Sequence, residues 1–183
     1  MGSFMSLSTE LWIIHYNLNA FVETGTYLGA GVACARGFRR LDEFHSVEMK
    51  QEFFDDAVHM FSRDPRVHLW LGDSQEQLPN ILSFPSLEDK RILFWLDAHL
   101  PKFYNYDGPT LPLEEELKII ARMRPRNDDV IIIDDLRIYA EDEYEFGNDQ
   151  HAANYDFVKE IMGDRYSIAK SLQHTGYLVL LPK

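Results

Sequence analysis

Acidic side chains follow five apolar segments of the chain, each at the point where the segment ends. They are Glu23, Glu48, Asp73, Asp97 and the adjacent pair Asp134 and Asp135. If these segments are parallel strands of one sheet, their carboxyl ends share an edge, and the carboxylates converge on one ligand crevice. The alternative is that they only solvate strand ends or cap the following helices, which explains a single residue more easily than the whole set.

A loop containing glycines follows the first of these segments, in the run Phe21 to Gly31 (FVETGTYLGAG). Glycine lets the backbone approach a ligand closely and turn sharply into the helix expected at 32–37. The loop fits the dinucleotide pattern Gly-x-Gly-x-x-Gly poorly, and Glu23 would repel a pyrophosphate group at the helix N-terminus. The loop therefore favours a cofactor without phosphate groups.

The remaining acids suggest a ribose contact and a metal site. Glu48 lies 48 − 25 = 23 residues after Gly25, near the offset of about 20 at which an acid accepts hydrogen bonds from ribose hydroxyls. Asp97, Asp134 and Asp135 would offer oxygen ligands of the kind that Mg²⁺ and Ca²⁺ prefer, and would repel one another without a cation. The competing interpretation of the pair is that one Asp caps a turn while the other pairs with Arg137 or Lys102.

His99 is the candidate general base, because it lies two residues beyond Asp97 and an imidazole titrates near neutral pH. A metal ligand or an ordinary loop histidine is the rival interpretation. The segment 100–110 that follows contains Pro, Gly and three aromatic residues. It is expected to be a loop that covers the substrate, although its rings could equally pack on neighbouring helices.

Strand-like and helix-like segments alternate along most of the chain. Strands are expected at 20–23, 44–48, 67–71, 91–96 and 129–133, and helices at 32–37, 49–61, 74–82 and from near Thr110 through Ala121. A helix containing Ala153, Phe157 and Ile161 then precedes two strands, 166–170 and 177–181, joined by a turn around His174. This order predicts an α/β fold, a doubly wound, mostly parallel sheet with helices on both faces and a C-terminal antiparallel hairpin.

Length and composition indicate one domain, residues 1–183, with a helical N-terminal segment within 1–19. Residues 1–3 resemble a cloning remnant, which leaves open that the chain is a domain of a longer protein. The net charge of −12 disfavours nucleic acid as a partner and favours cationic ligands. Neither a membrane span nor a signal peptide is expected, so the chain is predicted to be cytoplasmic, and Cys34 to be a small core residue.

The runs at 22–26 (VETGT), 71–74 (LGDS), 94–99 (FWLDAH) and 133–135 (IDD) carry a family resemblance. The glycine loop resembles motif I of class I S-adenosylmethionine (SAM)-dependent methyltransferases, although Tyr27 stands where many members have glycine. The acids after the fourth and fifth strands resemble those of small metal-dependent O-methyltransferases. These include the catechol type and the macrocin O-methyltransferase and cephalosporin-hydroxylase-like group. The resemblance covers residues 20–183.

The resemblance implies a Rossmann-like, seven-stranded sheet, SAM as cofactor and a divalent metal, with Mg²⁺ ahead of Mn²⁺ or Ca²⁺. Asp73 would then accept from the adenine amine, and Lys102 would be a second candidate base, with His174 a weaker third. The implied cofactor-binding residues are Glu23, Thr24, Gly25, Thr26, Tyr27, Gly29, Glu48, Asp73, Ser74 and Asp97. The implied metal ligands are Asp97, Asp134 and Asp135, and the implied catalytic residues are His99, Asp97 and Lys102.

The leading hypothesis is a metal-assisted O-methyltransferase for a small polyhydroxylated acceptor, a sugar or glycan ahead of a catechol. One alternative is a metal-dependent phosphoester hydrolase, because clustered Asp and His serve that chemistry too. Another is a noncatalytic nucleoside-binding module of a larger glycan-modifying protein. The expected partners are a small-molecule or glycan acceptor and either a second copy of the chain or a parent multidomain chain, with no nucleic acid or membrane.

Overall fold

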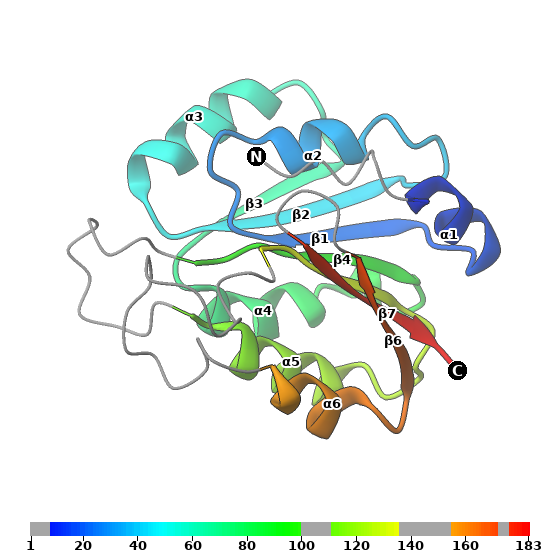
Figure 1. Cartoon of the computed structure of the whole chain (residues 1–183). Helices are drawn as coiled ribbons and strands as arrows, with labels where there is room; N and C mark the ends of the chain where they lie inside the picture. The colour runs from blue at the N-terminus through cyan, green and yellow to red at the C-terminus, as the bar shows by residue number, and fades with distance from the viewer. Residues whose placement is uncertain (1–7, 100–110, 136–154, 172–175) are drawn as a thin grey trace.

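A mixed, seven-stranded sheet organises the chain in the computed structural model, which describes residues 8–99, 111–135, 155–171 and 176–183 (Figure 1). The strand order is β3-β2-β1-β4-β5-β7-β6, with β1 to β5 parallel and β7 antiparallel to both β5 and β6. The strands are β1 (Ala20–Thr24), β2 (Glu43–Glu48), β3 (Val67–Leu71), β4 (Ile92–Leu96), β5 (Val130–Ile133), β6 (Tyr166–Ser171) and β7 (Tyr177–Pro182). The predicted fold class, including the C-terminal hairpin, is confirmed.

Helices cover both faces of this sheet (Figure 1). The helices α1 (Thr9–His15), α2 (Ala30–Ala35) and α3 (Gln51–Phe61) lie on one face, and α4 (Ser74–Leu82), α5 (Leu113–Met123) and α6 (Asp156–Met162) on the other. Each layer packs on alternate residues of the central strands: Phe21 faces the first layer, whereas Ala20 and Val22 face the second. The two cores are therefore built from opposite sides of the same strands.

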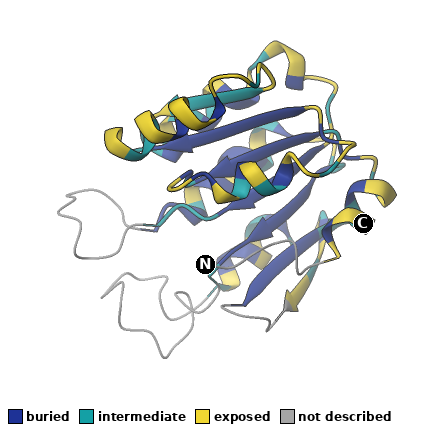
Figure 2. Cartoon of the chain, turned by 90° about the horizontal axis from the view of Figure 1, so that it is seen from above, coloured by how far each residue is buried: buried dark blue, intermediate teal, exposed yellow. Residues whose placement is uncertain are grey.

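The central strands are apolar because both of their faces are covered. Every residue of β1, β2, β4 and β5 is buried, whereas the edge strand β3 is only partly buried. Figure 2 shows the same contrast, with buried strands in the middle and exposed surface on the outward faces of the helices. Within the described ranges, no helix combines the length and hydrophobicity needed to cross a bilayer.

Most helix and strand boundaries agree with expectation within three residues, and the differences have local causes. The helix expected at 32–37 begins earlier, at Ala30, because Gly29 has a left-handed backbone (φ 73°) that turns the chain into it. The helix expected from near Thr110 begins at Leu113, directly after Pro112. A short 3₁₀ helix at Pro85–Leu87 was not expected. Cys34 is partly buried and packs against the core, close to its predicted role.

Candidate functional site: an acidic crevice at the strand ends

The order of the strands reverses between β1 and β4, the neighbouring central strands from which the chain winds in opposite directions. Ligands in open α/β sheets bind in a crevice at the carboxyl ends of strands at such a point, so the carboxyl ends of β1 and β4, with the loops that follow them, are the candidate crevice of this chain. The loops that leave β1 and β4 touch there: a Cβ on Gly25, whose φ is 85°, would lie 2.7 Å from the carbonyl oxygen of Asp97. Only glycine satisfies both the backbone angle and the close approach.

Glu23 is deeply buried at this edge. Its Oε2 accepts a hydrogen bond of 2.6 Å from Ser46 Oγ, and Ser46 Oγ lies 2.6 Å from Thr26 Oγ1. Because the Ser46 proton is used on Glu23, the Thr26 hydroxyl is the donor in the second bond. The pKa of Glu23 rises to about 8, mainly because of burial; the Ser46 hydrogen bond opposes this rise and the charge of Glu48 adds to it. No cationic side chain among the described residues pairs with Glu23.

The loop after β1 is held by the end of β2. Both oxygens of the Glu48 carboxylate accept backbone N–H groups at 2.8 Å, Oε2 from Tyr27 and Oε1 from Lys50. Tyr27 has a left-handed backbone (φ 44°), which is costly for a residue with a side chain. Glu48 therefore fixes the loop, and each of its oxygens keeps a second lone pair for a ligand hydroxyl. The ribose role of Glu48 stays a prediction.

Asp73 and Ser74 begin α4 at the end of β3. The Asp73 side chain is the N-cap of this helix, because its Oδ1 accepts the Gln75 N–H at 2.8 Å. Capping was the alternative to a ligand role for this residue, and the structure shows it. Since Asp73 has a second carboxylate oxygen, a contact with the adenine amine remains a prediction.

Three side chains converge at the ends of β4 and β5. His99 Nδ1 lies 3.6 Å from Asp97 Oδ1, and His99 Nε2 lies 3.3 Å from Asp135 Oδ2. One ligand atom from each of the three residues falls within 4.8 Å of the others, a spacing that a metal ion could bridge. Asp135 has a left-handed backbone (φ 50°), and such strain is concentrated at functional sites.

Asp134 lies beside this cluster but is used differently. It is buried, and its Oδ1 accepts the N–H of Asp135 at 2.7 Å. Burial holds the pKa of Asp97 well above its usual range, and the negative charges of Asp134, Asp135 and Glu23 raise it further. The predicted repulsion among these acids is therefore present. The structure groups His99, rather than Asp134, with Asp97 and Asp135.

The predicted cofactor residues line the same edge of the sheet as this cluster, at the carboxyl ends of β1 and β2, in the turns after β1, β3 and β4, and at the start of α4. Gly29 is the N-cap residue of α2 and lies against Phe61 of α3. Lys102, Arg137, His174 and the expected cover loop 100–110 lie outside the described residues. Their roles stay predictions.

Sequence reasoning missed two buried residues of this edge. Ser46 pairs with Glu23 in the register of β1 and β2, so the strand alignment could have identified it. Glu116 was interpreted with Glu114 and Glu115 as charge at a helix start, yet it is buried in α5. Its position among Leu113, Leu117 and Ile120 on the apolar face was the available signal.

No protein-family model matches the chain, and no curated protein matches it in sequence. Solved structures do match its fold. The SAH-bound methyltransferase PaMTH1 from Podospora anserina has a TM-score of 0.67 at 18% identity, with 100% of this chain and 80% of that chain covered. The O-methyltransferase TomG from Streptomyces achromogenes, in complex with SAM, gives 0.67 at 16% identity, covering 100% and 81%.

An O-methyltransferase from Bacillus cereus in complex with SAH gives a TM-score of 0.64 at 15% identity, with 100% of this chain and 82% of that chain covered. At these identities the similarity is one of fold. The predicted resemblance is confirmed at that level: this chain has the fold of class I SAM-dependent O-methyltransferases.

Proposed function

We propose that the chain is a SAM-dependent, divalent-metal-assisted O-methyltransferase. The observation that carries this proposal is the crevice between β1 and β4, where a glycine loop over a buried acid adjoins the Asp97, His99 and Asp135 cluster. The glycine loop and its buried acid suit a cationic nucleoside, whereas the Asp97, His99 and Asp135 cluster suits a metal ion that activates a hydroxyl group. Their common strand edge would place donor and acceptor side by side.

The residues of the glycine loop fit a sulfonium cofactor. Gly25 and Gly31 have no room for a Cβ, so the backbone of the loop stays close to the strand ends. Beneath it lies the buried Glu23 carboxyl group, which a bound cation would favour in its ionised form, because attraction between opposite charges is stronger in a buried setting than in water. SAM supplies an electrophilic methyl group when bound, and Glu48 and Asp73 would position its ribose and adenine.

The metal would be held by Asp97 and Asp135, with Asp134 next to them. A bound divalent ion lowers the pKa of a coordinated hydroxyl group. His99 would remove the proton from the acceptor with one ring nitrogen, while the carboxylate beside the other ring nitrogen stabilises the imidazolium that forms. Direct ligation by His99 is the alternative role, consistent with the same distances.

A small polyhydroxylated acceptor is proposed, with a sugar or glycan ahead of a catechol. Vicinal hydroxyl groups can approach a metal together, and the negative charge of the chain disfavours a phosphate-rich polymer. A cytoplasmic location and the absence of a membrane partner belong to the same proposal. A screen of acceptors with labelled methyl donor would identify the class.

Calorimetry with SAM and S-adenosylhomocysteine (SAH) tests the cofactor, and turnover with and without EDTA tests the metal. EDTA should abolish turnover while SAH affinity is retained, because the nucleoside contacts come from other strand ends. Asp135→Asn is a suitable change, because asparagine also tolerates a left-handed backbone. It should lower turnover by at least about 100-fold, because loss of a residue that only supports a metal ligand already costs up to about 100-fold in activity. Asp89→Asn, at a 99% exposed side chain, is the matched control.

Three outcomes would contradict parts of this proposal. Absence of SAM and SAH binding together with phosphoester cleavage would favour the hydrolase alternative. If the chain binds SAH but transfers no methyl group to any acceptor, a nucleoside-binding module would be favoured. Full turnover in EDTA would remove the metal while leaving the methyltransferase.

A further inference from the structure

Tyr27 adopts a strained conformation in the loop that shapes the crevice. Its φ is 44°, in the left-handed region that glycine enters at little cost but that a residue with a side chain disfavours. Gly25 and Gly29 have φ values of 85° and 73°, so the loop uses this kind of backbone at three positions. Tyr27 is 45% exposed, so burial in the core does not hold it there. Contacts at the surface of the molecule must do so.

Two contacts tie Tyr27 to the start of α3. The first is made by its backbone N–H, which donates to Glu48 Oε2 at 2.8 Å, while Glu48 Oε1 accepts the N–H of Lys50, the N-cap residue of α3. The second is made by its ring, which meets the Phe53 ring edge to face, with centroids 4.7 Å apart and planes at 71°. Because Phe53 lies in the first turn of α3, the two contacts hold the loop and the helix start together.

The Phe53 ring is placed for this contact rather than for the core. It is half-buried, and among the described residues it belongs to neither of the two buried cores. Phe61, further along α3, is the opposite case, because it is buried in the core on that side of the sheet and also lies against Gly29. The loop therefore meets α3 at two points. Core packing explains the one at Phe61 but not the one at Phe53.

We infer that Phe53 is a positioning residue for the cofactor, whose ring holds Tyr27, and with it the glycine loop, in the conformation that binds the nucleoside. This inference rests on the proposed function, because it concerns the binding of SAM. Phe53 acts through Tyr27 and not on the reacting atoms. A loop that spends less time in its binding conformation has a proportionally lower affinity. Loss of the ring should therefore weaken cofactor binding and leave the chemical step, at the ends of β4 and β5, largely intact.

Substitutions at Phe53 test the ring. Phe53→Ala should weaken SAH binding by about threefold to tenfold, as expected for one edge-to-face pair, with a matching rise in the KM for SAM and little change in kcat. Phe53→Tyr keeps the ring and should bind SAH within about twofold of the wild type. Phe54→Ala is the matched control, because Phe54 is the next residue of α3, is also half-buried and is also outside both described cores. It should bind SAH like the wild type.

Substitutions at Tyr27 separate the strain from the ring. Tyr27→Ala removes the ring and keeps the strained backbone, so it should lose as much affinity as Phe53→Ala, and the two losses should not add in the double variant. Tyr27→Gly also removes the ring but relieves the strain, and should bind SAH at least about threefold more tightly than Tyr27→Ala. If Phe53→Ala fails to fold, this pair of variants at an exposed position provides the test.

Amide exchange of Tyr27 tests the same role without the cofactor. Its N–H is held by Glu48 Oε2, so release of the loop should speed its exchange in the free chain. The rate should rise by about threefold or more in Phe53→Ala, in proportion to the lost ring pair, and should stay unchanged in Phe54→Ala. Circular dichroism and thermal unfolding would establish that each variant is folded.

The inference would be overturned if folded Phe53→Ala bound SAH and exchanged the Tyr27 amide like Phe54→Ala. Additive losses from Phe53→Ala and Tyr27→Ala would overturn it as well. So would equal affinities of Tyr27→Ala and Tyr27→Gly, because a ring that contacts the cofactor directly would make both variants equally weak. Failure of the wild-type chain to bind SAH would contradict the proposed function and this inference together. Wild-type binding that survives in folded Phe53→Ala contradicts this inference alone.

Discussion

Gly31 constrains the position of the Glu23 side chain, because it lies directly against the Glu23 carboxyl group. A Cβ at this position would lie 1.6 Å from Glu23 Oε1 and 2.8 Å from the carboxyl carbon. Glu23 cannot turn away easily, since Ser46 holds its other oxygen at 2.6 Å. The first turn of α2 and the buried acid therefore fit together only when residue 31 has no side chain.

Gly31→Ala should lower stability by about 1–3 kcal/mol through overpacking and weaken SAH binding at least about tenfold. The sign is diagnostic, because the same change in an open helix position stabilises by up to about 1 kcal/mol. Urea unfolding and calorimetry measure the two effects. Ala33→Ser, at an exposed position of the same helix, is the control and should alter neither. A stabilised Gly31→Ala chain that binds SAH normally would show that Glu23 is free to move.

The acids of the crevice could be predicted because each follows an apolar run, and strand ends share one edge of a parallel sheet. Ser46 and Glu116 depend instead on which strand lies beside which and on which face of α5 meets the sheet. For the same reason, the backbone groups that Asp73 and Glu48 bind could not be predicted from the sequence. Their backbone hydrogen bonds arise from the way the chain turns after each strand, which residue type alone does not specify.

At the level of elements, β2 and β3 are joined by a buried polar network on the side of α4. Trp70 Nε1 donates to His45 Nδ1 at 3.1 Å, so the His45 proton is on Nε2, which donates to Glu43 Oε1 at 3.0 Å. Ser86 Oγ also donates to Glu43. The His68 ring stacks on His45 at 4.7 Å between centroids. Both ring nitrogens of His45 are occupied, which favours a structural role over metal binding.

This network predicts a loss of stability at mildly acidic pH. The pKa of His45 falls to about 4, mainly because the ring is buried; nearby His68 contributes to this fall, whereas the hydrogen bond and charge of Glu43 oppose it. Below a pH of about 6.5 the unfolded chain protonates this histidine and the folded chain does not. The contribution of neutral His45 to the free energy of unfolding is therefore complete above that pH and is lost as the pH falls toward 4. The loss between pH 7 and 5 is on the order of 1–2 kcal/mol.

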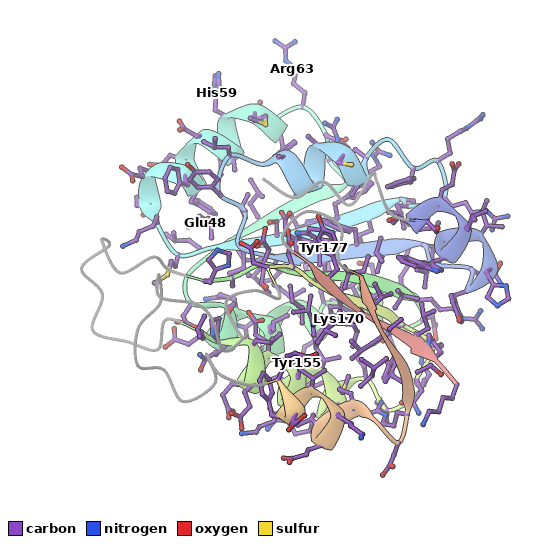
Figure 3. All side chains as sticks on the ribbon, viewed as in Figure 1. Glu48, His59, Arg63, Tyr155, Lys170 and Tyr177 are labelled. Carbon is purple, nitrogen blue, oxygen red and sulfur yellow. The ribbon has the colours of Figure 1, made fainter. Side chains whose placement is uncertain are left out.

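His45→Gln should remove this pH dependence, which urea unfolding at pH 7 and pH 5 measures. His59→Gln is the control, because His59 is exposed on α3 and points away from the molecule (Figure 3). Glu23, whose pKa is raised, has the opposite effect and increases stability as the pH falls. This effect is the same in the wild type, His45→Gln and His59→Gln, so it cancels in the comparison. Although burial opposes it, hydrogen bonds from Ser86 and His45 hold the pKa of Glu43 below its usual value. Equal pH dependence in all three chains would contradict the prediction.

Element types and their order followed from apolar periodicity, since the strands read as apolar runs and the helices as amphipathic segments. The bounds of β3 (Val67–Leu71) and α4 (Ser74–Leu82) are as predicted, because Gly72 and the N-cap residue Asp73 mark the end of the strand and the start of the helix. The 3₁₀ helix at Pro85–Leu87 has no such pattern, because three residues are too few to show a period. The order of strands in the sheet was not predicted, since alternation fixes neighbours only loosely.

At the scale of the whole molecule, one buried ion pair ties the edge opposite the crevice together. Arg124 Nε and Nη2 donate to Asp129 Oδ2 and Oδ1, each at 2.9 Å, and Asp129 Oδ1 also accepts the Ile92 N–H at 2.7 Å. Arg124 further donates to the carbonyl groups of Leu87 and Lys90. The end of α5, the start of β5 and the start of β4 therefore meet at one side chain.

Arg124→Met should lower the free energy of unfolding by about 3–5 kcal/mol, because it leaves the fully buried Asp129 without its cation. Arg126→Met is the control, since that side chain is 44% exposed and its ion pairs are worth about 1 kcal/mol or less. Asp129→Asn should restore part of the loss in the double variant, because the orphaned charge is removed while an oxygen remains for Ile92 N–H. Urea unfolding of the four chains measures these differences. Equal stability of Arg124→Met and Arg126→Met would mean that the sheet is held by apolar packing alone at this end.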